Sequence, residues 1–112
     1  MSALALTLPS RAGTVNPGAA VAATDTINRV VLGTRGVLLE IINGNAGADA
    51  MTISDASTTS SGAPAATLAP SVAAGTNRVF KITPDMADPV TGLVTITHGV
   101  TATVTYKMYP RD

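Results

Sequence analysis

The residues able to do acid–base or metal chemistry are few and widely separated in this chain. His98 is the single histidine, and there is no cysteine. A lone histidine has no second ring with which to share a metal ion or relay a proton. Because His98 stands directly before Gly99 and between two runs of alternating apolar residues, we interpret it as a turn residue.

Asp85 and Asp88 are spaced to share one face of a helical turn. Two such carboxylates could act as a general acid and a general base. Acidic residues in the first turn of a helical segment are equally expected, because they interact favourably with the helix dipole. We favour this second interpretation.

Asn43, Asn45, Asp49 and Asp55 supply the oxygen atoms that calcium prefers. Their spacing does not follow the D-x-[DN]-x-[DN]-G loop, and no Glu closes the set. Asn and Asp also end strands by bonding to nearby backbone. The segment NGNAGAD, residues 43–49, is therefore predicted to be a turn between two strands.

Other catalytic patterns are missing from the sequence. The serines of STTSSG lie in no G-x-S-x-G elbow, and neither phosphate-binding glycine motif occurs. Aromatic residues make up 3% of the chain, too few for a base-stacking platform or a sugar-binding cleft. We expect no catalytic residue, no metal and no cofactor, and a protein that acts through its surface rather than as an enzyme.

Composition bounds the fold and the partners. A chain of 112 residues has the usual size of one domain, and 46% hydrophobic with 12% charged residues predicts that it folds. Basic and acidic residues cancel, which argues against nucleic acid as a partner. The sequence shows neither a signal peptide nor an apolar run near the roughly 20 residues that span a bilayer. We expect no membrane association.

Apolar residues recur with a period of two, which is typical of strands. GVLLEII is apolar on both faces except at Glu40, whereas NRVFKIT points Phe80 and Ile82 inward and leaves Val79 and Lys81 outside. Frequent turn signals between such strands predict an all-β fold, an antiparallel β-sandwich or small barrel of jelly-roll-like form without substantial helix. TPDMADPVTG is expected to hold one helical turn, with Thr83 as its cap and Pro84 at its first position.

Two tight connections are predicted from the pattern. GTRG, residues 33–36, would join the strands INRVVL and VLLEII as a hairpin. In the last hairpin, pairing Ile96 with Val100 keeps the apolar residues on one face, so the loop is predicted to be residues 97–99. Gly99 would supply its left-handed conformation. The threonines that alternate with these apolar residues are expected to face solvent.

We therefore expect a single β domain over residues 1–112, in which two segments stand apart. Residues 1–24 form either an N-terminal arm or a first strand, and residues 54–76 form a long loop excursion that packs on a neighbouring subunit. Arginine is enriched at protein interfaces. The candidate interface residues from these segments and from the arginines are Leu4, Leu6, Leu8, Arg11, Arg29, Arg35, Pro64, Leu68, Pro70 and Arg78.

The order of strands and loops resembles that of small head-decoration, or capsid cement, proteins of tailed bacteriophages. The likeness covers roughly residues 27–109 and rests on GVLLEIINGNAGADAMTISD, SVAAGTNRVFKI and GLVTITHGVTATVTYKMY. In that group an L-x-I-x-N strand leads to an A-x-x-V-T-I strand, a V-x-A-G-T turn precedes the next strand, and a G-x-V-x-[IV] strand begins the closing hairpin. The stretch STTSSGAPAATLAP and the N-terminal segment have no counterpart there.

The resemblance implies a structural virion protein that binds the outside of the major capsid protein shell, often as a homotrimer. Such a protein would be made in the host cytoplasm and end in the virion. Two alternatives remain open: another small virion component of the tail or head–tail connector, and a stand-alone module that recognises glycans or cell surfaces. Saturable binding to undecorated capsids separates the first expectation from these.

Overall fold

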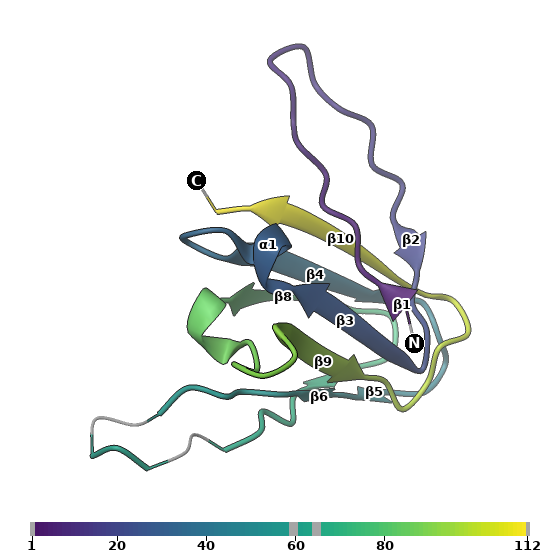
Figure 1. The fold of residues 1–112 in the computed structure, drawn as a ribbon. Coiled ribbons are helices and arrows are strands. Elements are labelled where there is room, and N and C mark those ends of the chain that lie inside the picture. The colour runs from purple at the N-terminus through teal and green to yellow at the C-terminus, as the bar shows by residue number, and fades with distance from the viewer. Residues whose placement is uncertain (1, 59–60, 64–65, 112) are drawn as a thin grey trace.

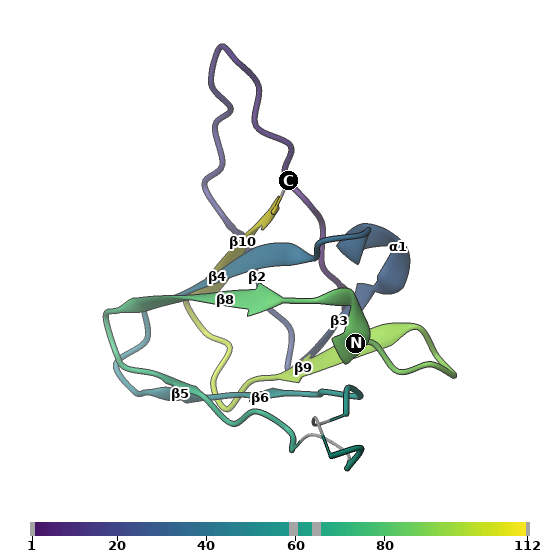
Figure 2. The same ribbon diagram turned by 90° about the vertical axis from the view of Figure 1, so that its left-hand side faces the viewer.

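Alternating apolar side chains build two β-sheets that lie face to face as the layers of a sandwich (Figures 1 and 2). The first sheet has the order β1-β3-β9-β6, from Ser2–Ala3, Thr24–Asn28, Leu93–Thr97 and Thr52–Ile53. The second has the order β2-β10-β4-β8, from Ala19–Ala20, Val104–Pro110, Val37–Asn43 and Asn77–Ile82. A short pair, β5 (Asp49–Ala50) and β7 (Ser71–Val72), adjoins them. The fold, a computed structural model describing residues 2–58, 61–63 and 66–111, confirms the all-β prediction.

Helical structure is limited to two short connectors within the described residues. The single turn α1 covers Arg29–Leu32, and a 3-10 turn covers Pro84–Met86. Thr83 precedes the second turn and Pro84 occupies its first position, as the sequence predicted. Both connectors carry the chain from one sheet to the other (Figure 2).

The core fills the space between the two inner faces. Val37, Leu39 and Ile41 of β4 are fully buried, and Ile27 and Ile96 face them from the first sheet. Phe80 and Ile82 point inward from β8 as predicted, while Val79 is 59% exposed on the outer face. The outer face of β4 is less covered than its apolar sequence suggested, since Leu38 is 38% exposed.

The predicted closing hairpin is wrong. β9 pairs with β3 and β6, whereas β10 pairs with β2 and β4, so residues 98–103 cross from one sheet to the other. The parity argument could not detect this, because a strand keeps its apolar face toward the core in either sheet. Thr103, not Gly99, adopts the left-handed conformation, with φ 58°.

The predicted hairpin at residues 33–36 is also wrong, because its two strands belong to different sheets. The chain leaves β3, makes the turn α1, and enters β4 of the second sheet. Gly36 is required here: it has φ 90°, and a Cβ atom would lie 2.0 Å from the carbonyl oxygen of Ile82. No side chain fits that approach.

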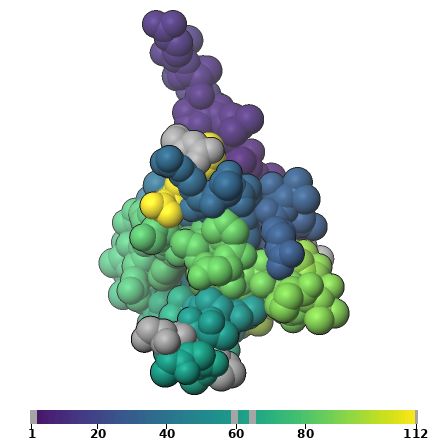
Figure 3. All heavy atoms as spheres, turned by 60° about the vertical axis from the view of Figure 1, so that its left-hand side comes forward, coloured from purple at the N-terminus to yellow at the C-terminus, as the bar shows by residue number. Residues whose placement is uncertain are grey.

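A first arm, residues 5–18, projects from the edge of the second sheet (Figures 1 and 3). At its base, Thr7 N–H donates to the Met108 carbonyl at 2.8 Å, and Asn16 Nδ2 donates to the Tyr109 hydroxyl at 3.1 Å. At its tip, Gly13 N–H donates to the Ser10 carbonyl at 3.0 Å. Residues 8–15 between these points are all exposed.

A second arm, of which residues 54–58, 61–63 and 66–67 are described, leaves the first sheet after β6 (Figure 1). Ile53 pairs with Leu68 in an isolated bridge, and β5 pairs with β7 just beyond it. These pairings close the base of the arm. The predicted excursion over residues 54–76 thus includes the arm, its returning strand β7 and the turn before β8.

Candidate functional site

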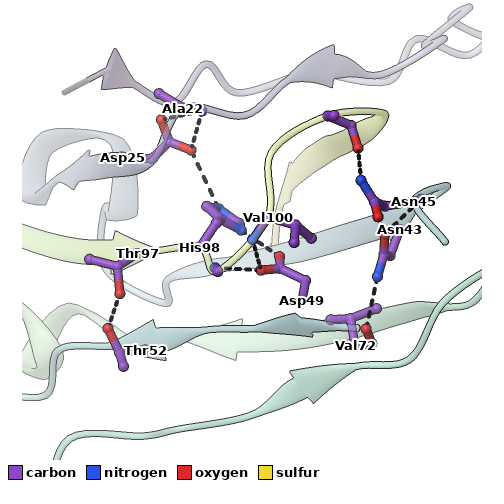
Figure 4. A network of polar contacts seen from close by, with 12 residues as sticks. Ala22, Asp25, Asn43, Asn45, Asp49, Thr52, Val72, Thr97, His98 and Val100 are labelled. Carbon is purple, nitrogen blue, oxygen red and sulfur yellow. Dashed lines mark hydrogen bonds and ion pairs between the residues drawn. The ribbon is translucent and has the colours of Figure 1, made fainter. Parts of the chain in front are cut away.

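The chain's only histidine lies in the interior and not in an exposed turn (Figure 4). The His98 side chain is 0% exposed. Its Nδ1 atom is 2.7 Å from Asp49 Oδ2, and its Nε2 atom is 3.5 Å from Asp25 Oδ2. The prediction of a turn residue is corrected: one imidazole links two buried carboxylates from β3 and β5.

Asp49 organises the crossover that begins at His98. Its Oδ1 atom accepts hydrogen bonds from the backbone N–H of Gly99 at 2.8 Å and of Val100 at 3.3 Å, while Oδ2 contacts the imidazole. Gly99 packs closely here, because a Cβ atom would lie 3.1 Å from the Ala50 carbonyl oxygen. A side chain here would require the Ala50 carbonyl to shift by a few tenths of an ångström, and Gly99 does not adopt the left-handed conformation that was predicted.

Asp25 is buried with a weaker set of partners. The Ala22 N–H lies 3.2 Å from each of its carboxylate oxygens. Burial raises the pKa of the Asp25 carboxyl above its ordinary value, while the Ala22 N–H and the positive charges of His98 and of the chain's amino terminus act to lower it. Because burial prevails, this carboxyl holds a proton to higher pH than it would in water.

Asn43 and Asn45 extend the polar region and fulfil the predicted turn chemistry. Asn43 is buried, and its amide donates to the carbonyls of Gly47 and Val72 at 2.9 Å. Asn45 donates to the Ala102 carbonyl at 2.9 Å and accepts from Gly47 N–H. Asp49, which was grouped with them as a turn residue, belongs instead to the His98 network.

The sequence carries a signal for this network. Each polar residue stands two positions beyond a buried apolar residue: Asp25 before Ile27, Asp49 before Met51, His98 after Ile96, and Asn43 after Ile41. Side chains two apart in a strand share a face. If each alternating pattern of inward-facing residues is continued by one more inward position, all four polar residues fall inside the sandwich.

The geometry is that of a structural network and not of an open catalytic centre. The side chains of Asp25, Asp49 and His98 are at most 1% exposed, so a substrate cannot reach them. His98 Nε2 makes no hydrogen bond, although it is buried. Within the described residues no group of three or more His, Cys, Asp or Glu side chains is placed to hold a metal ion. What the arrangement can do is hold and release a proton between buried groups.

The carboxylates considered as an acid–base pair each make a local hydrogen bond. Asp85 lies in the first turn of the 3-10 segment, where it accepts a hydrogen bond from the Thr83 hydroxyl. Asp88 accepts from Val90 N–H at 2.8 Å and lines a pocket of about 400 Å³ at the base of the second arm. Asp55 lines the same pocket and bonds to Ser57. Each of these carboxylates thus bonds to a residue two positions away in its own turn.

The three leucines predicted as interface residues differ in exposure. Leu4 is 5% exposed and belongs to the core. Its backbone N–H donates to the Thr26 carbonyl, which continues the pairing of β1 with β3. Leu4 is corrected from interface to core. Leu6 is half-buried against the core, and Leu8 is 68% exposed on the first arm. The N-terminal segment thus begins as a strand and continues as an arm.

The arginines predicted as anchors are all exposed and lie in different places. Arg11 is at the tip of the first arm, Arg29 is in α1, and Arg35 is in the following turn. Arg78 lies 5.3 Å from the Phe80 ring centre and donates to the Ser71 carbonyl at 3.0 Å. The fold therefore does not gather the arginines into one surface.

The residues predicted from the excursion also separate. Leu68 is 44% exposed beside its bridge to Ile53, and Pro70 is half-buried with its carbonyl accepting from Met51 N–H. Pro64 lies outside the described residues. Exposed apolar surface at the base of the second arm is thus centred on Leu68.

Comparisons with protein-family models, with curated proteins and with solved structures found no match to this chain. Among the residues described, no helix is both long and apolar enough to cross a bilayer.

Proposed function

We propose that the chain is a structural assembly protein that binds a larger protein shell through its arms, in the manner of a decoration protein on the outside of a phage capsid. The observation that carries this proposal is the first arm. It leaves the sandwich with Leu8 68% and Val15 92% exposed, and only its base is bonded to the domain. Exposed apolar residues on a projecting hairpin suit burial against another protein.

The placement of the reactive groups supports a role in binding over a role in catalysis. The one imidazole is buried, and the exposed carboxylates Asp85 and Asp88 bond to their own turns. We infer that an exposed arm of this kind could also reach a neighbouring copy in a homotrimer. A tail or connector component would use the same surfaces, and the test below distinguishes it by its target.

The test is saturable binding to empty shells assembled from the major capsid protein encoded in the same genome. Purified protein is mixed with shells that carry no outer proteins, and co-sedimentation is measured over nanomolar to micromolar concentrations. We expect binding that saturates at a fixed ratio per capsid protein. The combined variant Leu8→Ser with Val15→Ser should bind at least tenfold more weakly, because its apolar contact is removed.

The chain offers a matched control. Val30 is 87% and Val90 is 90% exposed, and both lie outside the arms. The variant Val30→Ser with Val90→Ser loses similar apolar surface and should bind as the unchanged protein does. The proposal fails if no binding occurs at micromolar concentration, and binding to tail components or glycans instead would select one of the alternatives.

A further inference from the structure

We propose that Asp25, His98 and Asp49 form a proton-dependent latch, in which one proton between Asp25 Oδ2 and His98 Nε2 keeps the crossover 98–103 closed on β5. Loss of that proton at alkaline pH releases the crossover and loosens the base of the second arm. The inference concerns the interior of the domain and does not depend on what the arms bind.

The first step fixes the proton on the Asp49 side of the ring. Asp49 Oδ1 accepts from two backbone N–H groups, and its Oδ2 faces the ring. A carboxylate oxygen 2.7 Å from Nδ1 can only accept, so Nδ1 carries a proton and donates it. This contact fixes the tautomer of a neutral ring.

The second step concerns the other side. With the proton of a neutral ring on Nδ1, His98 Nε2 presents a lone pair, and it faces Asp25 Oδ2 at 3.5 Å in a site closed to water. If Asp25 were ionised, two hydrogen-bond acceptors, its Oδ2 atom and the His98 Nε2 lone pair, would face each other without a proton between them. One proton removes the conflict, whether it resides on the carboxyl or on the ring. The geometry thus requires that Asp25 and His98 together hold one more proton than an ionised aspartate and a neutral histidine would hold.

The third step identifies what the latch holds. The backbone N–H of His98 donates to the Ala23 carbonyl, and the backbone N–H groups of Gly99 and Val100 donate to Asp49 Oδ1. Asp49 is also paired with Val72, at the base of the second arm. The charged groups in contact with the imidazole are these two aspartates, one from β3 and one from β5. Opening the network therefore frees the crossover and β5 together.

The direction of the pH effect follows from the raised pKa of Asp25. In an open state the carboxyl ionises near pH 3.9 and an imidazole in water titrates near pH 6.5, both approximate reference values. Above about pH 6.5 the open state therefore lacks the proton that the closed latch keeps. The equilibrium constant for opening then rises by up to tenfold per pH unit, until the closed latch also loses its proton.

The experiment follows the ring and the backbone of the full chain in one titration. Because His98 is the single histidine, its ring nitrogens give unambiguous ¹⁵N NMR signals. We expect Nδ1 to stay protonated and Nε2 to share the proton with Asp25 at pH 6, with Nε2 changing to a bare lone pair as pH rises. Hydrogen exchange of Gly99 and Val100, corrected for intrinsic rates, should lose up to tenfold in protection per pH unit above about pH 6.5.

Two substitutions separate the latch from a merely structural network. In Asp25→Asn the amide supplies a donor that does not titrate, and its oxygen can still accept from Ala22 N–H, so protection above about pH 6.5 should not change with pH. The control Asp85→Asn removes an exposed carboxylate elsewhere and should keep the pH dependence of the unchanged protein. A bare Nε2 lone pair already at pH 6, or a steep loss of protection retained in Asp25→Asn, overturns the proposal. The wild-type titration decides even if a variant does not fold.

Discussion

The interior of this sandwich has two parts, an apolar middle and a polar end, and they specify the fold in different ways. In the middle, Leu39 and Ile41 of one sheet meet Ile96 of the other without polar groups. At the polar end, Asp25, Asn43, Asp49 and His98 use directed hydrogen bonds. Apolar contacts in the middle can hold the two sheets together at many registers. The hydrogen bonds of the polar end form only when particular strands lie side by side.

The largest expected effect comes from breaking the polar end. His98→Ala would leave two buried carboxylates without their shared partner, and we expect a loss of about 3–5 kcal/mol in the free energy of unfolding. Urea denaturation followed by circular dichroism measures it. A loss below about 1 kcal/mol would show that water replaces the imidazole and that the polar end does not specify the fold.

The matched change in the apolar middle is Leu39→Ala. The side chain is fully buried, so its truncation should cost about 3 kcal/mol through lost transfer energy and a cavity. The effect should be the same at pH 5 and pH 8, because the two residues opposite Leu39 in the sheet, Met108 and Phe80, do not titrate. A difference between the two pH values beyond experimental error would mean that the two parts are coupled.

The pH dependence should be specific to the polar end. Because the Asp25 pKa is raised in the folded state, its contribution to stability is complete below about pH 3.9 and is lost as pH rises through the folded value. Relative to Asp25→Asn, the unchanged protein should lose at most about 1.4 kcal/mol per pH unit over that window. Urea denaturation of both proteins between pH 5 and pH 9 measures the difference. Parallel curves would contradict the raised pKa.

The smallest effect is expected at the edge of the polar end, in the crossover. Thr103 has φ 58°, a conformation that strains a β-branched residue. Thr103→Gly should therefore raise the free energy of unfolding by about 1 kcal/mol. Thermal unfolding provides the measurement, with Thr101→Gly in the same crossover as the control that should not be stabilised. Equal behaviour of the two variants would place the strain elsewhere.

The sequence predicted the all-β class and most strand faces, because a period of two reports burial directly. Phe80, Ile82, Val94 and Ile96 point inward as expected. It did not predict the pairing, because an inward face is the same for a strand of either sheet. The hairpins at residues 33–36 and 97–99 were wrong for that one reason.

The candidate site was missed for a different reason. His98 and Asp49 were interpreted as turn residues because polar residues beside glycine usually end a strand. Their burial depends on partners 49 positions apart, as between Asp49 and His98, and no local pattern contains such a contact. Only the extension of the apolar stripes by one step pointed to the interior.

The strand order has a consequence for how the chain reaches this structure. Among the described strands, no two that follow each other in sequence pair with each other. β10, the last of the described strands, lies between β2 and β4, so the second sheet is incomplete until β10 itself has been synthesised. Contacts this distant in sequence slow folding, because loop closure precedes any stabilising pair. Completion of the second sheet therefore waits for β10, and no hairpin of neighbouring described strands can form first.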